Sequence, residues 1–283
     1  MELRLGRLLR YSKLMIDFLC IGAQKAGTTW LMANLSRHPE VWTPPFIKEL
    51  HYFDAIHLGY AQSHVLQTYL KRGQKFAADS LEKRAYIDKL LDPSFTFTDD
   101  WYRHIFSIAP RDSKVGECTP LYGALNDEGV QHVARLVPEV RLIYIIRDPF
   151  DRTLSSFRMA MDRRGTSNGD DVAGLLDQEL FMKRGDYRGN ITRWETYFDR
   201  AQILYVPFGH LRTDPKAVMR QVEGHLGISA FRGYPQLSDS VHRTKKEGKT
   251  IRPELLDRIK RLVDPQYSFL AERFGEPFVA SIK

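Results

Sequence analysis

The feature that most constrains the fold is a short apolar segment that ends in a glycine-containing turn. Residues 17–23 (DFLCIGA) have the composition of a buried strand. The turn 24–29 follows, and a helix is predicted over 29–37, ending before Pro39. A strand, a glycine loop and a helix in this order open an α/β nucleotide-binding unit.

Three further apolar segments predict strands at 114–118, 141–146 and 203–208. The segment 141–146 (RLIYII) is apolar nearly throughout, which is typical of a central parallel strand covered on both faces. Helices are predicted over 125–136, from Asp151 as a cap to about Met161, around Trp194 and Phe198, from Asp214-Pro215, and over 253–274 with an interruption at Pro265. We therefore predict an α/β fold: one three-layer sandwich domain, residues 1–283, around a central parallel sheet with a P-loop-like phosphate loop.

Two stretches are harder to interpret. Residues 60–110 are polar and aromatic and are expected to be helical in pieces. The segment 163–174 (RRGTSNGDDVAG) is rich in Gly, Ser, Asn and Asp, so it predicts a mobile loop.

The composition limits the class of partner and the compartment. The net charge of +7 and the pI of about 9.3 favour anionic partners, although a solvated basic surface would give the same numbers. The two cysteines, Cys20 and Cys118, lie in predicted strands and are expected to be core residues without a disulfide. No apolar run approaches the roughly 20 residues that span a bilayer. These features predict a cytoplasmic chain without a membrane span.

The first motif is GAQKAGTTW at 22–30, which has the GxxxxG spacing of a phosphate loop. Glycines let the backbone approach an anion, and the following helix directs free N–H groups toward it. In a nucleoside-triphosphate loop a lysine follows the second glycine, but here Thr28 stands there and Lys25 lies inside the loop. We predict a phosphate site without the usual Mg²⁺–triphosphate arrangement. The alternative is an ordinary strand-to-helix turn.

The second motif is RDPFDRTLSS at 147–156. Arg147 follows a predicted strand, at the edge where open α/β sheets bind ligands, and Ser155 lies about two helical turns further on. A guanidinium group donates a bidentate fork that suits phosphate. The alternative is an ion pair of Arg147 with Asp148 or Asp151.

Together the two motifs resemble the sulfotransferases that use 3′-phosphoadenosine-5′-phosphosulfate (PAPS). The resemblance covers residues 18 to about 274, and it implies that the first segment binds the 5′-phosphosulfate and the second the 3′-phosphate. The residues so implied for nucleotide binding are Lys25, Ala26, Gly27, Thr28, Thr29, Trp30, Arg147 and Ser155.

A third segment, KELHYFD at 48–54, is similar to the K/N-E-x-H-F-F-D segment of heparan-sulfate-type and bacterial sulfotransferases. In that branch the glutamate is the proposed general base, which implies Glu49 as the group that takes the acceptor proton. His51 is the competing base or an orienting group. Lys25, and with it Lys48, would neutralise charge on the leaving oxygen. Alternatively, Lys48 and Glu49 are surface charges beside an aromatic packing segment.

Further likenesses are more local. The segment 117–122 (ECTPLY) resembles E-K-T-P-x-Y, with Cys118 in place of the lysine, and implies that Glu117 and Tyr122 line the acceptor side. Tyr187 belongs to a G-x-Y likeness with Asn190 where a histidine is often found, and core packing is its alternative. Residues 243–250 (RTKKEGKT) resemble a loop that closes over the nucleotide, which implies roles for Arg243, Gly248 and Lys249.

The resemblance implies transfer of a sulfuryl group from PAPS to a hydroxyl or amine of a small molecule or saccharide, leaving 3′-phosphoadenosine-5′-phosphate (PAP). Nucleic acid is not an expected partner, and no metal is required. Two rivals are a P-loop kinase-like phosphotransferase and a non-catalytic module that binds polyanions. The missing lysine after Gly27 argues against the first, and salt-sensitive polyanion binding would mark the second. Neither the oligomeric state nor the acceptor can be identified from these patterns.

Overall fold

A five-stranded parallel sheet forms the centre of the protein. The computed structural model describes residues 16–234, 237 and 248–283. Within them the strand order is β2-β3-β1-β4-β5 and every neighbouring pair is parallel. The bounds are β1 (Phe18–Gly22), β2 (Val41–Trp42), β3 (Lys114–Cys118), β4 (Arg141–Ile146) and β5 (Ile203–Pro207).

The predicted fold class and the four longer strands are confirmed. All of β1 is buried, and so is β4 after Arg141, because helices cover both faces of the sheet. Cys20 and Cys118 are fully buried, unpaired by a disulfide, and directly opposite each other on β1 and β3. Strand β2 was not predicted, since two residues carry no readable periodicity.

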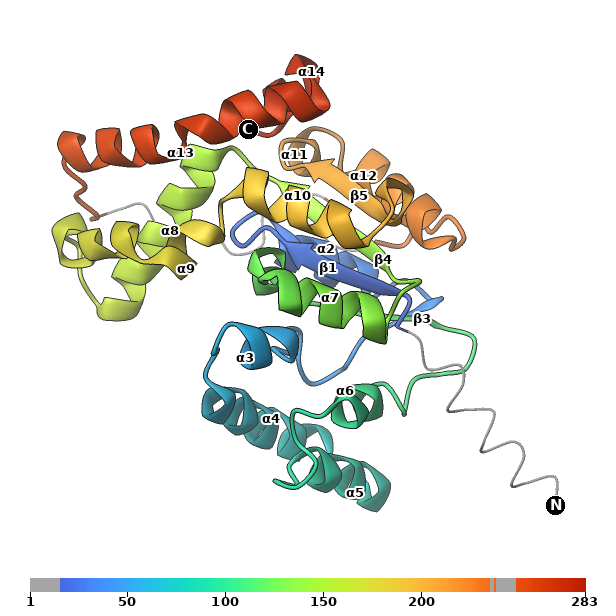
Figure 1. Cartoon of the computed structure of the whole chain (residues 1–283). Helices are drawn as coiled ribbons and strands as arrows, with labels where there is room; N and C mark the ends of the chain where they lie inside the picture. Colours follow the sequence, from blue (N-terminus) through green and yellow to red (C-terminus); the bar gives the residue numbers. More distant parts are fainter. Residues whose placement is uncertain (1–15, 235–236, 238–247) are drawn as a thin grey trace.

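Helices on opposite faces of the sheet follow from its strand order. The chain leaves β1 through α2 (Thr28–Leu35) toward β2 and β3, then crosses over β1 to β4 through α7 (Asp127–Leu136). Because parallel crossovers are right-handed, travel in opposite directions places these helices on opposite faces. Figure 1 shows α7 and α10 (Tyr187–Tyr197) in front of the sheet and α2 behind it. Helix α12 (Pro215–Leu226) packs on β4 and β5, after the short α11 (His210–Thr213).

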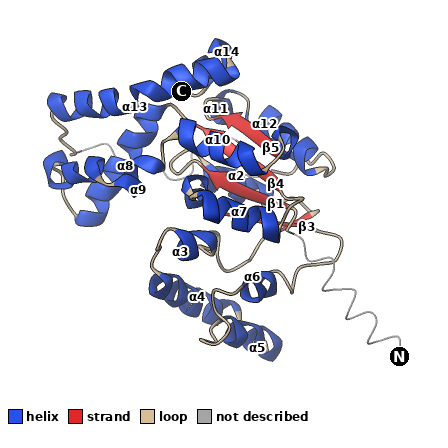
Figure 2. Cartoon of the chain, viewed as in Figure 1, coloured by secondary structure: helices blue, strands red, loops and turns tan. Residues whose placement is uncertain are grey.

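Residues 53–105 form a layer of helices beside the sheet, drawn below it in Figures 1 and 2. Its aromatic side chains are buried, with Tyr69, Trp101 and Tyr102 at 0% exposure. The expected helical pieces are α3 (Phe53–His57), α4 (Gln62–Phe76), α5 (Leu81–Leu90) and α6 (Asp99–Ile105).

The C-terminal half holds a second apolar cluster. Leu154 and Phe157 of α8 (Pro149–Arg164) pack there with Val172 and Ile259. Helix α13 (Pro253–Phe274) crosses α8 and continues through Pro265, so the expected interruption does not break it. The remaining helices are α9 (Glu179–Lys183), α14 (Glu276–Ser281) and the 3-10 helices η1 (Pro120–Ala124), η2 (Gly169–Asp177) and η3 (Arg200–Gln202).

Two local predictions were wrong. The segment 163–174 is not a free loop, because α8 runs to Arg164, η2 begins at Gly169, and Val172 is buried in the second cluster. The Gly169 N–H also donates to the Thr250 carbonyl at 2.8 Å, and the Thr250 N–H donates to the Ser167 carbonyl at 2.8 Å. The cap of α8 is Asp148, whose carboxylate accepts from the Asp151 N–H at 2.9 Å, so Asp151 lies inside the first turn.

Among the described residues, no helix is long and apolar enough to cross a membrane.

Candidate functional site

The order of the strands brings the two predicted phosphate-binding segments together. Strands β1 and β4 are neighbours, yet the connection after β1 leads to one side of the sheet and the connection after β4 leads to the other. Open α/β sheets bind ligands at such a switch point, at the carboxyl ends of the strands. The loop 23–27 follows β1 there, and Arg147 follows β4.

The loop after β1 opens the N-terminus of α2. Gly27 is the N-cap residue with φ of 87°, and no side chain caps the helix. A Cβ at this position would lie 2.5 Å from Cδ2 of Leu211, so the turn requires glycine for both conformation and space. The first N–H groups of α2 therefore remain available to an anion.

Arg147 reaches across to this loop. Its Nη1 donates to the carbonyl oxygen of Lys25 at 2.7 Å, and its guanidinium lies 4.6 Å from the ring centroid of Phe208. Its Nε is buried without a hydrogen-bond partner within the described structure. The alternative ion pair with Asp148 is disfavoured, because that carboxylate accepts from the Tyr267 hydroxyl at 2.9 and 3.0 Å and from a backbone N–H.

Tyr187 supports Arg147 from within the core. Its side chain is fully buried, and its hydroxyl donates to the Arg147 carbonyl at 2.8 Å and accepts from the Arg147 N–H at 3.1 Å. Both bonds are to the backbone, so Tyr187 orients the turn that carries the guanidinium. Trp194, three positions after the buried Ile191 on α10, is fully buried and packs against Phe198, as expected for a core residue.

Positive charge gathers around Lys25. Burial lowers the pKa of this lysine, and the charges of Arg147, Arg163 and Lys249 lower it further. Lys249 pairs with Asp162 of α8 at 2.6 Å. Mutual repulsion among these cations favours a bound anion between them.

The other predicted nucleotide-binding residues differ in their exposure to solvent. Ser155 is partly exposed on α8, Gly248 is exposed, and Trp30 is buried in α2 with 5% exposure. Ala26 is fully buried in the loop. Arg243 lies outside the described residues.

Lys48 connects the third motif to the phosphate loop. Its Nζ lies 3.3 Å from the Thr28 hydroxyl, 3.2 Å from the Thr29 hydroxyl and 3.3 Å from Oε1 of Glu49. In the sequence Lys48 lies about twenty positions after Thr28 and Thr29. The fold places the lysine over the first turn of α2.

Glu49, His51 and Asp54 form a hydrogen-bonded row. Nδ1 of His51 lies 2.6 Å from the buried carboxylate of Asp54, and Nε2 lies 3.4 Å from Oε2 of Glu49. The imidazole also stacks on Tyr60, with ring centroids 4.0 Å apart. Asp54 and Tyr60 were missed by the sequence analysis, although the three-residue spacing of His51 and Asp54 was a readable signal.

The hydrogen bonds and charges within this row shift the pKa values of His51 and Glu49 in opposite directions. Burial alone would lower the pKa of His51, but the hydrogen bonds and charges of Asp54 and Glu49 outweigh burial and raise the pKa to about 9. Burial alone would raise the pKa of Glu49, yet His51 and Lys48 hold it below its ordinary value. At neutral pH the site therefore holds an imidazolium beside an ionised glutamate.

Glu117 and Tyr122 lie inside the core beneath residues 50–52. Both side chains have 0% exposure. The Tyr122 hydroxyl accepts from the Tyr52 N–H at 3.0 Å, and Glu117 accepts from the hydroxyls of Tyr102 and Thr119. Tyr122 therefore contacts the backbone of the third motif, whereas Glu117 reaches it through Thr119, and neither side chain has exposed surface of its own.

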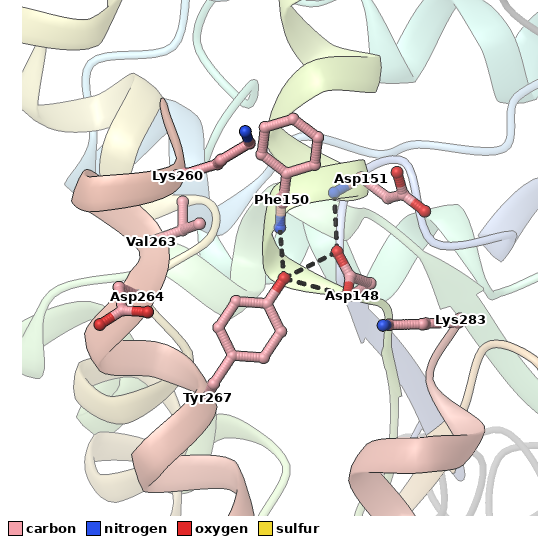
Figure 3. Close-up of a pocket in the computed structure, with 8 residues that line it drawn as sticks. All are labelled: Asp148, Phe150, Asp151, Lys260, Val263, Asp264, Tyr267 and Lys283. Atoms are coloured by element: carbon pink, nitrogen blue, oxygen red, sulfur yellow. Dashed lines mark hydrogen bonds between the residues drawn. The ribbon is translucent and has the colours of Figure 1, made fainter. Parts of the chain in front are cut away.

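A separate pocket of about 460 Å³ lies between α8, α13 and the end of the chain (Figure 3). The Tyr267 hydroxyl and the Asp148 carboxylate meet in it, and Asp151 and Asp264 add two more acidic groups. None of the predicted site residues lines this pocket. Two lysines, Lys260 and Lys283, line it beside these three carboxylates. No metal-binding group of three His, Cys, Asp or Glu side chains occurs in the described ranges.

Comparisons with known proteins identify similar sequences and similar structures. Residues 17–232 match the model of the family described as "Sulfotransferase family". The mouse bifunctional heparan sulfate N-deacetylase/N-sulfotransferase 3 is 26% identical over 82% of this chain and 25% of its own length. The human heparan sulfate glucosamine 3-O-sulfotransferase 3B1 is 24% identical over 90% of this chain and 58% of its own length. The chain thus spans about a quarter of the first relative and little more than half of the second.

Solved structures show the same fold. A sulfotransferase from Alicyclobacillus acidocaldarius superposes with a TM-score of 0.65 at 20% identity, covering 90% of this chain and 94% of that one. The sulfotransferase domain from the curacin biosynthetic pathway superposes with a TM-score of 0.56 at 18% identity, covering 89% and 96%.

Proposed function

This chain belongs to the sulfotransferase family, a family of PAPS-dependent transferases, and on that premise we propose that it moves the sulfuryl group of PAPS to a hydroxyl or amine of its acceptor. The observation that carries the proposal is the contact between the two anion-binding segments. Arg147 donates to the backbone of the Lys25 loop, so both segments face one site.

The residues present fit a doubly phosphorylated adenosine. The buried Nε of Arg147 has no hydrogen-bond partner among the residues that the structure describes, and a guanidinium nitrogen in this state favours an incoming phosphate oxygen. We assign Arg147 and Ser155 to the 3′-phosphate. The 5′-phosphate falls to Lys25, Thr28, Thr29 and the N–H groups of Ala26 and Gly27, while Trp30, Arg243, Gly248 and Lys249 complete the nucleotide site.

PAPS supplies an activated sulfuryl group, and the protein supplies a base and positive charge. Glu49 is ionised and takes the acceptor proton as the new bond to sulfur forms. His51 is already protonated at neutral pH, so its role is to hold Glu49 in place and not to accept the proton. Lys25 and Lys48 stabilise negative charge on the oxygen that leaves sulfur.

The class of acceptor is inferred from the relatives and from the positive charges near the site. Two relatives act, by their names, on heparan sulfate, and the cations Arg163, Arg184 and Lys249 lie near Lys25 or Tyr60. We propose a saccharide or small molecule that offers a hydroxyl or amine. A basic surface also supports the rival polyanion-binding module, so transfer itself must be measured.

The test is transfer to a defined panel of acceptors. The protein is incubated with PAPS and, separately, with an N-deacetylated heparosan oligosaccharide, an N-sulfated one, a phenol and a long-chain alcohol. Mass spectrometry should show PAP and a product heavier by the mass of one SO₃, and the Glu49→Ala variant should form neither. ATP with Mg²⁺ replaces PAPS in a parallel reaction, and a phosphorylated product there would support the kinase rival. Binding of the oligosaccharides without any PAP release would contradict the proposal.

A further inference from the structure

We propose that Glu117 is a positioning residue: through the hydroxyls of Thr119 and Tyr122 it holds the backbone that presents Glu49 and His51. This inference rests on the proposed function, since it concerns the same site. It assigns Glu117 and Tyr122 a role within the core in place of contact with the acceptor.

Three consecutive N–H groups of the third motif bind hydroxyls from η1 and the residue before it. The Thr119 hydroxyl accepts from Leu50 N–H at 2.9 Å and from His51 N–H at 3.5 Å. The Tyr122 hydroxyl accepts from Tyr52 N–H at 3.0 Å. Two side chains, Thr119 and Tyr122, therefore bind the backbone N–H groups of residues 50–52, and the Leu50 carbonyl accepts from the Tyr69 hydroxyl at 3.4 Å.

Both hydroxyls in turn adjoin Glu117. Thr119 Oγ1 donates to one carboxylate oxygen at 2.6 Å, and the Tyr122 hydroxyl lies close enough to the carboxylate to lower the pKa of Glu117. Tyr102 donates to the other oxygen at 3.0 Å. Glu117 is 0% exposed, so no water competes for these bonds.

The direction of every bond follows from the ionised carboxylate. A carboxylate only accepts, so it obliges the Thr119 and Tyr122 hydroxyls to donate their protons to it. Their lone pairs then face the N–H groups of residues 50–52, and the two lone pairs of Thr119 match two N–H donors. A neutral amide at position 117 offers one acceptor oxygen in place of two, so either the Thr119 or the Tyr102 hydroxyl must face its NH2 group and lose its acceptor.

The backbone of residues 50–52 sets the conformation of His51 and the position of Glu49. His51 has φ of 54°, a left-handed conformation that a non-glycine residue adopts only when its surroundings impose it. The conformation turns the imidazole toward both Asp54 and Glu49. Loosening residues 50–52 would let His51 relax and would move Glu49 with it.

Glu117 also gives the network a pH signature. Burial raises the pKa of Glu117 to about 7, against hydrogen bonds from Thr119, Tyr122 and Tyr102 and with a further rise from the charge of Asp54. The hydroxyl of Tyr69, from α4, is the remaining titratable group whose pKa responds to Glu117. Protonation adds a donor to the carboxyl group and disrupts the same bond pattern that Glu117→Gln disrupts.

The experiment is a double-mutant cycle of Glu117→Gln and Thr119→Val, read in two ways. The first reading is His51 itself: NMR titration of its imidazole, assigned with His51→Asn, should show the pKa falling from about 9 toward 6.5 in both single variants. The second is kcat with the acceptor that the transfer test identifies, which we expect to fall about tenfold to a hundredfold, the loss that one or two broken buried hydrogen bonds cause. Thr119→Ser, which keeps the hydroxyl, should restore both.

The coupling between the two substitutions distinguishes a positioning role of Glu117 from a general loss of packing. If Glu117 acts through Thr119, adding Glu117→Gln to Thr119→Val should change kcat by less than about twofold. Below pH 7 the wild-type kcat should decline, and Glu117→Gln should lack this decline. Tyr86→Phe is the control, because it also removes a buried hydroxyl, which bonds to the Ile105 carbonyl at 2.6 Å, and should leave the His51 titration unchanged.

Additive effects in the cycle, or an unchanged His51 titration in Glu117→Gln, would overturn the inference. The proposed function fails in a different way. If the wild-type protein neither binds PAP nor transfers from PAPS, the proposed function is wrong, whereas the His51 titration still tests the network by itself.

Discussion

At the scale of single residues, the site depends on which group is charged at neutral pH. The sequence left Glu49 and His51 as competing bases. His51 lies between two carboxylates, which raise its pKa, and Glu49 lies beside Lys48, which lowers its pKa; this arrangement supports our proposal that Glu49 is the base.

Glu49→Gln should therefore lower kcat by about a hundredfold or more, the usual effect of losing a general base, while the affinity for PAP stays within about twofold of wild type. Transfer assays and calorimetry measure the two quantities. Glu128→Gln, which alters an exposed glutamate on α7, should change neither. Wild-type kcat in Glu49→Gln would remove Glu49 from the mechanism.

His51 should make the free energy of unfolding depend on pH. Its pKa is about 9 in the folded protein and 6.5 as the ordinary value, so the folded state binds the proton more tightly. The stabilisation is complete below pH 6.5 and is lost as the pH rises through about 9. Urea unfolding at pH 6 and pH 9.5 should show a loss about 3 kcal/mol greater in wild type than in His51→Asn, since each tenfold change in proton affinity corresponds to about 1.4 kcal/mol. Equal losses in the two proteins would contradict the row of hydrogen bonds.

At the scale of elements, the turn between β1 and α2 determines whether the nucleotide site forms. Gly27 has a positive φ and no space for a Cβ beside Leu211, whereas Gly224 of α12 is exposed with open space around it. The same substitution thus has opposite expected effects at the two positions.

Gly27→Ala should destabilise the protein by more than the 1–2 kcal/mol or so that a left-handed conformation costs an alanine, and it should weaken PAP binding. Gly224→Ala should instead stabilise by up to about 1 kcal/mol, because alanine has the higher helix propensity. Thermal unfolding with and without PAP measures both effects. A Gly27→Ala variant as stable as wild type would mean that the turn differs from the one described.

At the scale of the whole molecule, the nucleotide should tie together two loops that follow neighbouring strands of the sheet. A ligand at one hundred times its Kd stabilises a protein by about 2.7 kcal/mol. We expect PAP to raise the melting temperature well above the effect of ADP, which lacks the 3′-phosphate, and ATP with Mg²⁺ to have little effect. Arg147→Met should remove the difference between PAP and ADP, while Arg220→Met, which breaks an ion pair between an exposed arginine and the buried Glu223, should retain it. Equal stabilisation by ADP and PAP in wild type would contradict the assignment of Arg147.

The sequence by itself determined the elements and the chemistry of each segment. Apolar runs specified β1, β3, β4 and β5 almost to the residue, because buried strands leave a continuous local signal. The glycine turn, the arginine after β4 and the glutamate of the third motif were also readable. Local composition misjudged the segment 163–174, since its burial comes from α13, about eighty residues away.

Only the tertiary structure decided which of these segments meet. Strand order is a long-range property, and the order β3-β1-β4 is what places Arg147 against the Lys25 loop. The tertiary structure likewise places Lys48 over α2 and Glu117 beneath residues 50–52. The charge of a side chain also depends on these contacts. The pKa of His51, for example, is set by the two carboxylates and by the burial that the fold provides. A sequence specifies side chains one position at a time, whereas hydrogen bonds and pKa values belong to pairs of groups that folding brings together.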